Sequence, residues 1–225
     1  MTETSSPTPQ MRLSRERILD AAMALVDRDG LNALSMRKLA QALGVKAMSL
    51  YNHVTNKDDI IDSLVDQVVS EIELPSLTDD WQTAMRRRAI SAHAVLLRHP
   101  WAAIALMSRV NVGPAMLRYI DTTLGCLVEA GFSYEMADRI WNAIDSHIYG
   151  FTLQELNFPL EAEQYSDVAA SFVSNIPADQ YPYMNQLTHL VMDGQYNGLH
   201  DFEFGLDLIL NDLELAHRSA TDPVS

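Results

Sequence analysis

Residues 34–66 read "LSMRKLAQALGVKAMSLYNHVTNKDDIIDSLVD", and this stretch decides the fold of the N-terminal part of the chain. Ser35 is a residue type that caps helices, and the "MRKLAQAL" after it places its leucines on one helical face. Gly44 stands where a helix commonly ends in a left-handed residue. A second helix is predicted over 45–54, and the order helix, glycine turn, helix is typical of a helix-turn-helix.

Helices are also predicted on both sides of this stretch. Ser14 is a plausible N-cap for "RERILDAAMALVDRDG", which carries an apolar stripe and ends at Gly30. Asn56 caps a helix that runs to Pro75, and two aspartates in its first turn suit the positive end of the helix dipole. The N-terminal region is therefore expected to be a three-helix domain followed by a connecting helix.

Beyond Pro75 the apolar periodicity remains helical. It predicts helices over about 79–98, 100–109, 114–130, 133–157, 161–174 and 200–217. No alternating strand pattern and no internal repeat is evident, so the predicted fold class is all-α. The prolines and glycines of 158–200 favour an irregular crossover or a mobile flap there.

Charge is distributed unevenly along the chain. The whole sequence of 225 residues has a formal net charge of -14, but residues 12–57 hold 8 Lys+Arg against 4 Asp+Glu. All three lysines, Lys38, Lys46 and Lys57, lie in that segment. A basic head on an acidic body predicts a local contact with a polyanion such as DNA, because the acidic body repels it elsewhere.

Composition also bears on the compartment. No apolar run approaches the roughly 18 to 20 residues that cross a bilayer, and "MTETSSPTPQ" lacks the features of a signal peptide, so we expect a cytoplasmic protein without a membrane partner. Cys126 is the only cysteine, which excludes an intrachain disulfide and a cysteine-rich metal site. A buried structural thiol is its expected role.

The stretch quoted first resembles the DNA-binding domain of the TetR family of transcriptional repressors. The helices, the Gly-Val turn, "LYNHV" and the following "NK" occur in the family's order, and the match covers roughly residues 13–72. Further along, "DDWQTAMRRRAISAHAVLLRHP", "LVEAGFS" and "SHIYGFTLQELNF" resemble the tetracycline repressor subgroup. The resemblance implies the following organisation: disordered tail 1–11, helix-turn-helix DNA-binding domain 12–57, connecting helix 58–75, ligand-binding and dimerisation domain 76–218, and tail 219–225.

Candidate DNA contacts follow from the helix-turn-helix. A recognition helix reads base edges in the major groove from its first turn, which here is Lys46, Ala47, Met48 and Ser49. By resemblance, Arg37 is a further base-reading residue whose guanidinium suits guanine. Also by resemblance, the phosphate contacts are Ser35, Tyr51, His53 and Lys57, although Tyr51 is also compatible with sealing the small domain and both lysines with ordinary solvation.

For the body, the resemblance implies a homodimer and a small-molecule inducer. The helices 133–157 and 200–217 are its expected dimer helices, although their apolar faces are equally compatible with an ordinary core. The family's tetracycline-binding members have Asn and Phe where this chain has Arg88 and Ala92, and a metal-binding His where "WAAIALMSRVNVG" has none. We therefore expect an inducer other than tetracycline and no metal or cofactor.

The candidate ligand-binding residues are aromatic, sulfur-containing and ionisable. Arg88 shares a helical stripe with apolar residues, so an inward orientation requires a carboxylate such as Asp145 or Glu155, or an anionic ligand. The alternative is a solvated face formed by Arg86, Arg87 and Arg88. The full candidate set is Arg88, Ala92, Trp101, Met107, Met116, Trp141, Asp145, Phe151 and Glu155.

Two other functional classes are alternatives to a ligand-released repressor of a palindromic operator. An all-α enzyme requires a nucleophile with a base or clustered metal ligands, and the spacing of the histidines and Glu155 predicts neither, so no enzyme is expected. A protein-interaction module that has lost DNA binding is disfavoured by the retained Arg37, Lys46 and Lys57.

Overall fold

The computed structural model describes residues 12–160, 164–196 and 201–221, and within them it contains helices and no strand, which confirms the all-α class. The expected tail 1–11 and the last part of the expected tail 219–225 lie outside these ranges. In chain order the helices are α1 (Arg15–Asp29), η1 (Leu31–Ala33), α2 (Met36–Leu43), α3 (Ala47–Leu50), α4 (Lys57–Ser70), α5 (Trp81–Arg98), α6 (Pro100–Ser108), α7 (Pro114–Glu129), α8 (Tyr134–Asn157), α9 (Tyr165–Phe172), η3 (Val173–Asn175), α10 (Pro182–Met192) and α11 (Phe202–Thr221).

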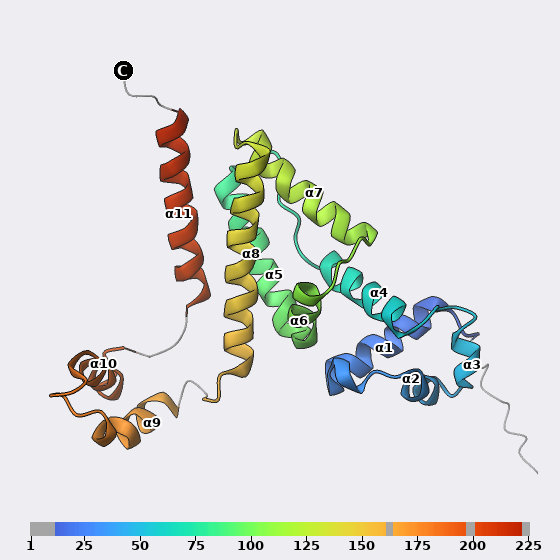
Figure 1. Ribbon diagram of the computed structural model, residues 1–225, viewed down its shortest axis with the longest axis horizontal. Helices are drawn as coiled ribbons and strands as arrows, with labels where there is room; N and C mark the ends of the chain where they lie inside the picture. The colour runs from blue at the N-terminus through green and yellow to red at the C-terminus, as the bar shows by residue number, and fades with distance from the viewer. Residues whose placement is uncertain (1–11, 161–163, 197–200, 222–225) are drawn as a thin grey trace, which may run out of the picture.

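A small head formed by α1, α2 and α3 lies at one end of the molecule, and α4 leads from it into the body (Figure 1). Ile18, Leu39 and Leu50 lie in the apolar core of the head, and all three are fully buried. Val54 is also buried, so Leu50 and Val54 anchor the recognition helix and the turn that follows it.

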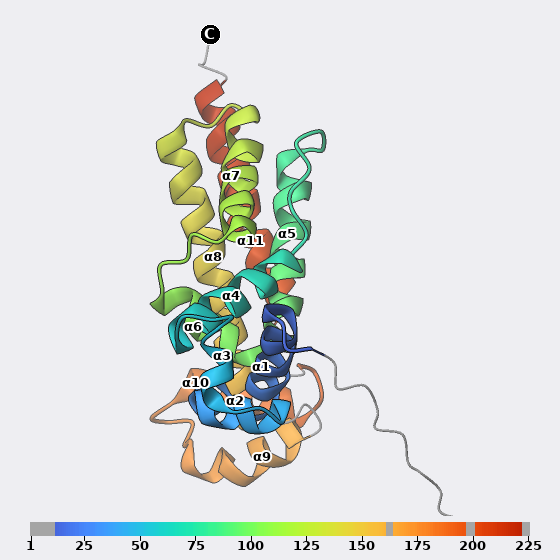
Figure 2. The ribbon, with the colours of Figure 1, turned by 90° about the vertical axis from the view of Figure 1, so that its right-hand side faces the viewer.

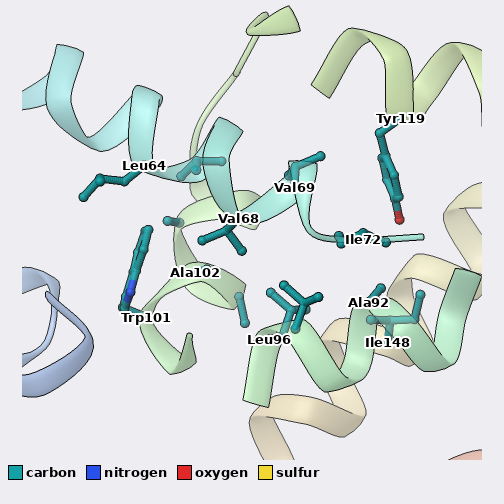
Figure 3. Packing of buried hydrophobic residues seen from close by; sticks show 14 of the residues in the cluster. Leu64, Val68, Val69, Ile72, Ala92, Leu96, Trp101, Ala102, Tyr119 and Ile148 are labelled. Carbon is teal, nitrogen blue, oxygen red and sulfur yellow. The ribbon is translucent and has the colours of Figure 1, made fainter. Parts of the chain in front are cut away.

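The head and the body share one continuous apolar core, and α4 provides the connection. Leu64, Val68 and Val69 of α4 face residues of α5 and α6, including Leu96 and Trp101 (Figure 3). Burying side chains of this size contributes about 1.5–3 kcal/mol each relative to exposure. The connecting helix is therefore packed against the body rather than tethered loosely to it.

The long helices α5, α7, α8 and α11 form the upright body seen in Figure 2. On α5 the predicted stripe of Trp81, Met85, Arg88, Ala92 and Leu96 is buried along its whole length. Cys126 on α7 is buried as well, and burial raises the pKa of its thiol, as expected for a structural cysteine.

The segment 158–200 is more regular than its sequence predicted. Its described part folds into α9 and α10, which pack against each other away from the long helices (Figure 1). The sequence does not predict α10 because proline favours turns, whereas Pro182 occupies the first turn of this helix, where proline is tolerated. At the other end, α11 continues to Thr221, beyond the predicted end at 217.

Candidate nucleic-acid interface and ligand cavity

The turn between α2 and α3 has the geometry of a glycine-capped helix end. Gly44 has φ 67°, and its N–H donates to Gln41 O at 3.2 Å. The N–H of Val45 donates back to Ala40 O at 3.0 Å, so two carbonyls at the end of α2 are satisfied. A residue with a Cβ is strained at this φ, which explains the glycine between the two helices.

The recognition helix is short, since α3 ends at Leu50 and a hydrogen-bonded turn replaces the rest of the predicted 45–54 helix. Of the four predicted base-reading residues, Lys46 and Met48 project into solvent, and the Met48 side chain is 74% exposed. Ala47 and Ser49 are half-buried, and Ala47 packs against the apolar core. Lys46 and Met48 are therefore the side chains that the first turn of α3 exposes to solvent.

The predicted phosphate contacts differ in accessibility. Tyr51 is exposed, whereas Ser35, His53 and Lys57 are half-buried; Arg37, the further base-reading candidate, is also exposed. The Oγ atom of Ser35 accepts the N–H of Lys38 at 3.2 Å as the N-cap of α2. Because the hydroxyl acts only as an acceptor in that bond, its hydrogen can still be donated to a phosphate.

Arg15 connects three parts of the head through hydrogen bonds, a role that the sequence did not reveal. Its guanidinium donates to the carbonyl of His53 at 3.1 Å, to Oδ1 of Asp59 at 2.6 Å and to Oγ of Ser63 at 2.7 Å. The hydrogen bond from Arg15 holds the pKa of Asp59 below its usual value. Arg15 lies on α1, so this network fixes the turn after α3 against both α1 and α4.

A second polar network joins the head to the body through Asp27 of α1. Its Oδ1 atom accepts the indole N–H of Trp101 at 2.7 Å and lies 2.8 Å from Nδ1 of His99. Glu71, just after α4, lies 3.3 Å from the other ring nitrogen of His99. Trp101 was predicted to line a ligand pocket, and the structure instead places it in the first turn of α6, against α1.

Two further candidate ligand residues also lie at the α4 side of the body. Met107 is exposed near the end of α6, and Met116 is half-buried in the first turn of α7. The backbone N–H groups of Ala115 and Met116 donate to the carboxylate of Asp66 on α4, at 3.2 and 2.9 Å. Asp66 therefore caps α7, and neither methionine lines the cavity described below.

Arg88 is fully buried and forms an ion pair with Asp145 of α8, so the interpretation of Arg88 as part of a solvated arginine face is wrong. Asp145 also accepts the indole N–H of Trp141 at 2.8 Å and the hydroxyl of Tyr149 at 3.2 Å. The guanidinium carbon of Arg88 lies 4.6 Å from the ring centroid of Tyr119. Burial raises the pKa of both tyrosine hydroxyls, which remain neutral.

An open cavity of about 780 Å³ lies between α5, α8 and the start of α11. Phe151 and Glu155 are the predicted ligand residues that line it, and Ala92 is buried in the core instead. Sequence reasoning missed the rest of the lining, because α11 approaches α5 only in the folded chain. The other described lining residues are Ile90, His93, Ala94, Leu97, Tyr196, Asp201, Phe202, Glu203 and Phe204.

Aromatic stacking organises one wall of this cavity. The Phe202 ring lies parallel to His93 at 4.1 Å and to His147 at 4.9 Å between centroids. The Phe151 ring meets His93 edge-on at 5.7 Å. Nε2 of His93 lies 3.1 Å from Oε2 of Glu155, and Nδ1 lies 2.8 Å from the hydroxyl of Thr152.

Within the described ranges, no three His, Cys, Asp or Glu side chains are grouped in a way that could hold a metal ion. No helix among the same residues is long and apolar enough to cross a membrane. The cavity can provide hydrogen bonds, stacking and apolar contacts. The exposed face of the head can provide cationic and apolar contacts.

Two protein-family models match the chain. Residues 18–64 match the model described as "Bacterial regulatory proteins, tetR family". Residues 74–216 match the model described as "Tetracyclin repressor-like, C-terminal domain".

Individual relatives and solved structures agree with these models. An HTH-type transcriptional regulator of Saccharopolyspora erythraea is 37% identical over 61% of this chain and 59% of its own length. The tetracycline repressor protein class D of Escherichia coli is 29% identical over 91% of this chain and 90% of its own. The crystal structure of ActR from Streptomyces coelicolor in complex with actinorhodin is 28% identical and covers 91% of this chain and 98% of its own, with a TM-score of 0.76.

Proposed function

Because the chain belongs to the TetR family of bacterial transcriptional regulators, we propose that it represses transcription from a palindromic operator and that a small molecule bound in its body releases it. Members of this family are transcriptional regulators rather than enzymes, and they bind DNA and small-molecule ligands as dimers. The palindromic operator, the release by a ligand and the residues that perform each step are our proposal.

The observation that carries the DNA-binding part is the exposed face of α2 and α3. Lys46 and Met48 project from the first turn of α3, and the exposed Arg37 lies on α2. In the proposed complex these three side chains meet the major groove. The phosphate contacts come from Ser35, Tyr51, His53 and Lys57, on a head that Arg15 keeps rigid.

Dimerisation is proposed through α8 and α11. Phe204 and Leu208 stand one helical turn apart on α11, and they are 64% and 59% exposed. Large apolar side chains exposed at this spacing favour burial against a second copy of the chain. A two-fold dimer would carry two heads related by symmetry. Such a pair would bind a palindromic operator whose half-sites are about one helical turn of DNA apart.

The proposed inducer site is the cavity between α5, α8 and the start of α11. Its volume of about 780 Å³ falls within the usual range for small-molecule sites, and aromatic side chains supply much of its lining. Phe151 and Glu155 are the predicted ligand residues that we retain for this site. The Arg88–Asp145 pair is assigned to the stability of the body instead.

The route from the cavity to the head runs along α5. Arg98 ends α5, His99 follows it, and α6 begins at Pro100. A shift of α5 on ligand binding would therefore move His99 and Trp101, which bond to Asp27 of the head. The ligand releases DNA only if it binds the released conformation more tightly than the DNA-bound one.

Salt-dependent DNA binding tests the proposal. The probe is a fragment that the protein selects from the genomic DNA of its source, and the variant is Lys46→Ala/Lys57→Ala. Each lysine charge that no longer displaces counterions from the DNA should reduce the magnitude of the slope of log affinity against log salt by about 0.9. The matched control, Arg118→Ala/Arg139→Ala, removes the same charge from exposed positions on α7 and α8 and should leave the slope unchanged. Equal slopes in the lysine variant and the wild type would refute the proposed docking.

A further inference from the structure

Hydrogen-bond accounting fixes which nitrogen of His93 carries its proton. The hydroxyl of Thr152 lies 2.6 Å from the carbonyl of Ile148, which can only accept, so the single hydroxyl hydrogen is donated there. The same oxygen lies 2.8 Å from Nδ1 of His93 and must act as the acceptor in that contact. His93 therefore carries a hydrogen on Nδ1, and in the neutral ring Nε2 is a bare acceptor.

The bare nitrogen faces another acceptor. Nε2 of His93 lies 3.1 Å from Oε2 of Glu155, and neither atom has a hydrogen when the ring is neutral and the carboxyl is ionised. This contact becomes a hydrogen bond only if one shared proton is added. Burial lowers the pKa of His93 despite the carboxylate beside it, and the neighbouring His147 acts in the same direction. The neutral ring is thus favoured, and the two acceptors lack a donor.

The charge around this point disfavours an anion. Glu155, Asp201 and Glu203 are among the described residues that line the cavity, and that described lining includes no lysine or arginine. Arg86 pairs with Glu203 at 2.6 Å, and the backbone N–H of Phe204 donates to Asp201 at 2.9 Å. Among the described lining residues, Glu155 is therefore the carboxylate that has neither an arginine nor a helix N-terminus beside it. Aromatic rings of Phe151, Phe202 and Phe204 complete the surroundings.

We infer that this cavity selects a flat aromatic ligand that is neutral or cationic and whose hydroxyl or N–H group donates to Nε2 of His93 and Oε2 of Glu155 from beside the pair. This assignment rests on the proposed function only for the statement that the bound molecule is the inducer. The donor would supply the hydrogen that the two acceptors lack, and the ring system would lie against the phenylalanines. An aromatic carboxylate of the same size would meet the negative charge of Glu155 and bind more weakly.

Three fluorescent probes of equal ring size test the inference directly. They are 1-hydroxypyrene, 1-methoxypyrene and 1-pyrenecarboxylate, and their affinities for the full chain are measured by fluorescence titration at neutral pH. We expect the hydroxyl probe to bind about tenfold more tightly than the methoxy probe. The carboxylate should bind more weakly than both. Equal affinity of the hydroxyl and methoxy probes, or a preference for the carboxylate, would overturn the inference.

Two variants test whether His93 and Glu155 cause the preference for the hydroxyl probe over the methoxy probe. His93→Phe keeps a ring beside Phe202 but removes the acceptor, and Glu155→Gln removes the acceptor charge; each should reduce the tenfold preference toward unity. Glu129→Gln, at an exposed position on α7 away from the cavity lining, should retain it. A hydroxyl preference that persists in both cavity variants would contradict the assignment.

A measurement on the unaltered protein covers the case in which a variant does not fold. The nitrogen and carbon chemical shifts of His93 distinguish its tautomers and its charged form. The inference requires a neutral ring protonated on Nδ1 at neutral pH, and a ring that is charged or protonated on Nε2 would overturn it. None of these readouts involves DNA, so an absence of operator binding would count against the proposed function and leave the ligand assignment standing.

Discussion

Arg88 on α5 and Asp145 on α8 form an ion pair in the interior of the body, yet the Arg88 side chain is only partly satisfied. Among the residues that the structure describes, Nε and Nη1 of Arg88 have no hydrogen-bond partner. The Tyr119 ring lies beside the guanidinium and compensates part of its charge. Asp145 is better satisfied, since Trp141 and Tyr149 also donate to it. The buried Arg88 charge is therefore stabilised by the ion pair with Asp145 and by the Tyr119 ring rather than by a complete set of hydrogen bonds.

Arg88→Met should destabilise the fold strongly. The substitution keeps an unbranched apolar stem but leaves Asp145 buried without its cation, and breaking a buried pair in this way costs about 3–5 kcal/mol. The two remaining donors to Asp145 favour the lower end of that range. Urea denaturation followed by tryptophan fluorescence measures the free energy of unfolding.

The double variant Arg88→Met/Asp145→Leu is the matched test of this reasoning. With neither charge present, no ion is left buried, and stability should recover most of what the single variant lost. A double variant less stable than Arg88→Met would show that the two residues do not act as a pair.

The sequence was sufficient for the fold class, the helix-turn-helix and the family. Apolar periodicity and capping residues are local signals, and Ser35, Gly44 and Asn56 act at the positions those signals predicted. The subgroup resemblance in the body is likewise confirmed by the family model that matches residues 74–216. Local rules failed at α10, where a proline begins a helix instead of breaking one.

The candidate cavity was only partly predictable, since its walls come from distant segments. Phe151 and Glu155 shared one predicted helix and do line it, but Phe202 comes from α11 and has no sequence signal that ties it to His93. Trp101 is an aromatic residue whose surroundings periodicity does not determine, and only tertiary packing places it against Asp27. The partner of Arg88 was one of two carboxylates considered, and periodicity alone did not decide between them.

Gly113→Ala should destabilise the junction between α4 and α7. A Cβ at this position would lie 2.2 Å from Oδ1 of Asp66, whose carboxylate caps α7 through the N–H groups of Ala115 and Met116. The carboxylate would have to move and give up those bonds, at a cost of about 1–3 kcal/mol. Thermal or urea unfolding measures the loss.

Gly125→Ala is the control for this prediction, because a Cβ there would lie 3.7 Å from Leu77, an ordinary contact distance. Gly125 is in the interior of α7, where alanine has the higher helix propensity, so this variant should be at least as stable as the wild type. If both variants had the same stability, the close approach to Asp66 would not matter.

The stability of the protein should carry an acid-sensitive contribution from His93. Burial lowers the pKa of this ring from its ordinary 6.5, so the unfolded chain binds a proton more readily than the native one. Stability from this source is fully present above pH 6.5 and falls as the pH drops toward the lowered folded value. Other ionisable side chains lie close to His93, so the informative quantity is the difference from a variant.

His93→Phe is the variant with which the pH dependence of the wild type is compared. The free energy of unfolding is measured by urea denaturation between pH 8 and pH 5 for both proteins. The wild type should lose more stability than the variant as the pH falls, since the variant has no imidazole to protonate on unfolding. Parallel pH profiles would mean that His93 has the same pKa in the folded and unfolded chain.

Met48 should contribute sequence preference rather than general DNA affinity. Its side chain is exposed on the first turn of α3 and carries no charge, so the partner it can recognise in the major groove is a thymine methyl group. Met48→Ala should weaken binding to the selected operator by about three- to tenfold through lost apolar contact. The salt slope should not change, because no phosphate contact is removed.

Replacing thymines of that operator by uracil, one position at a time, identifies the contact. Uracil lacks only the methyl group, so at the contacted position the substitution should weaken the wild type but not Met48→Ala. Gel-shift or anisotropy titrations of the four combinations measure this coupling at each position. If the two effects add at every position, Met48 does not touch a thymine methyl and the specificity of α3 rests on Lys46 and Ser49.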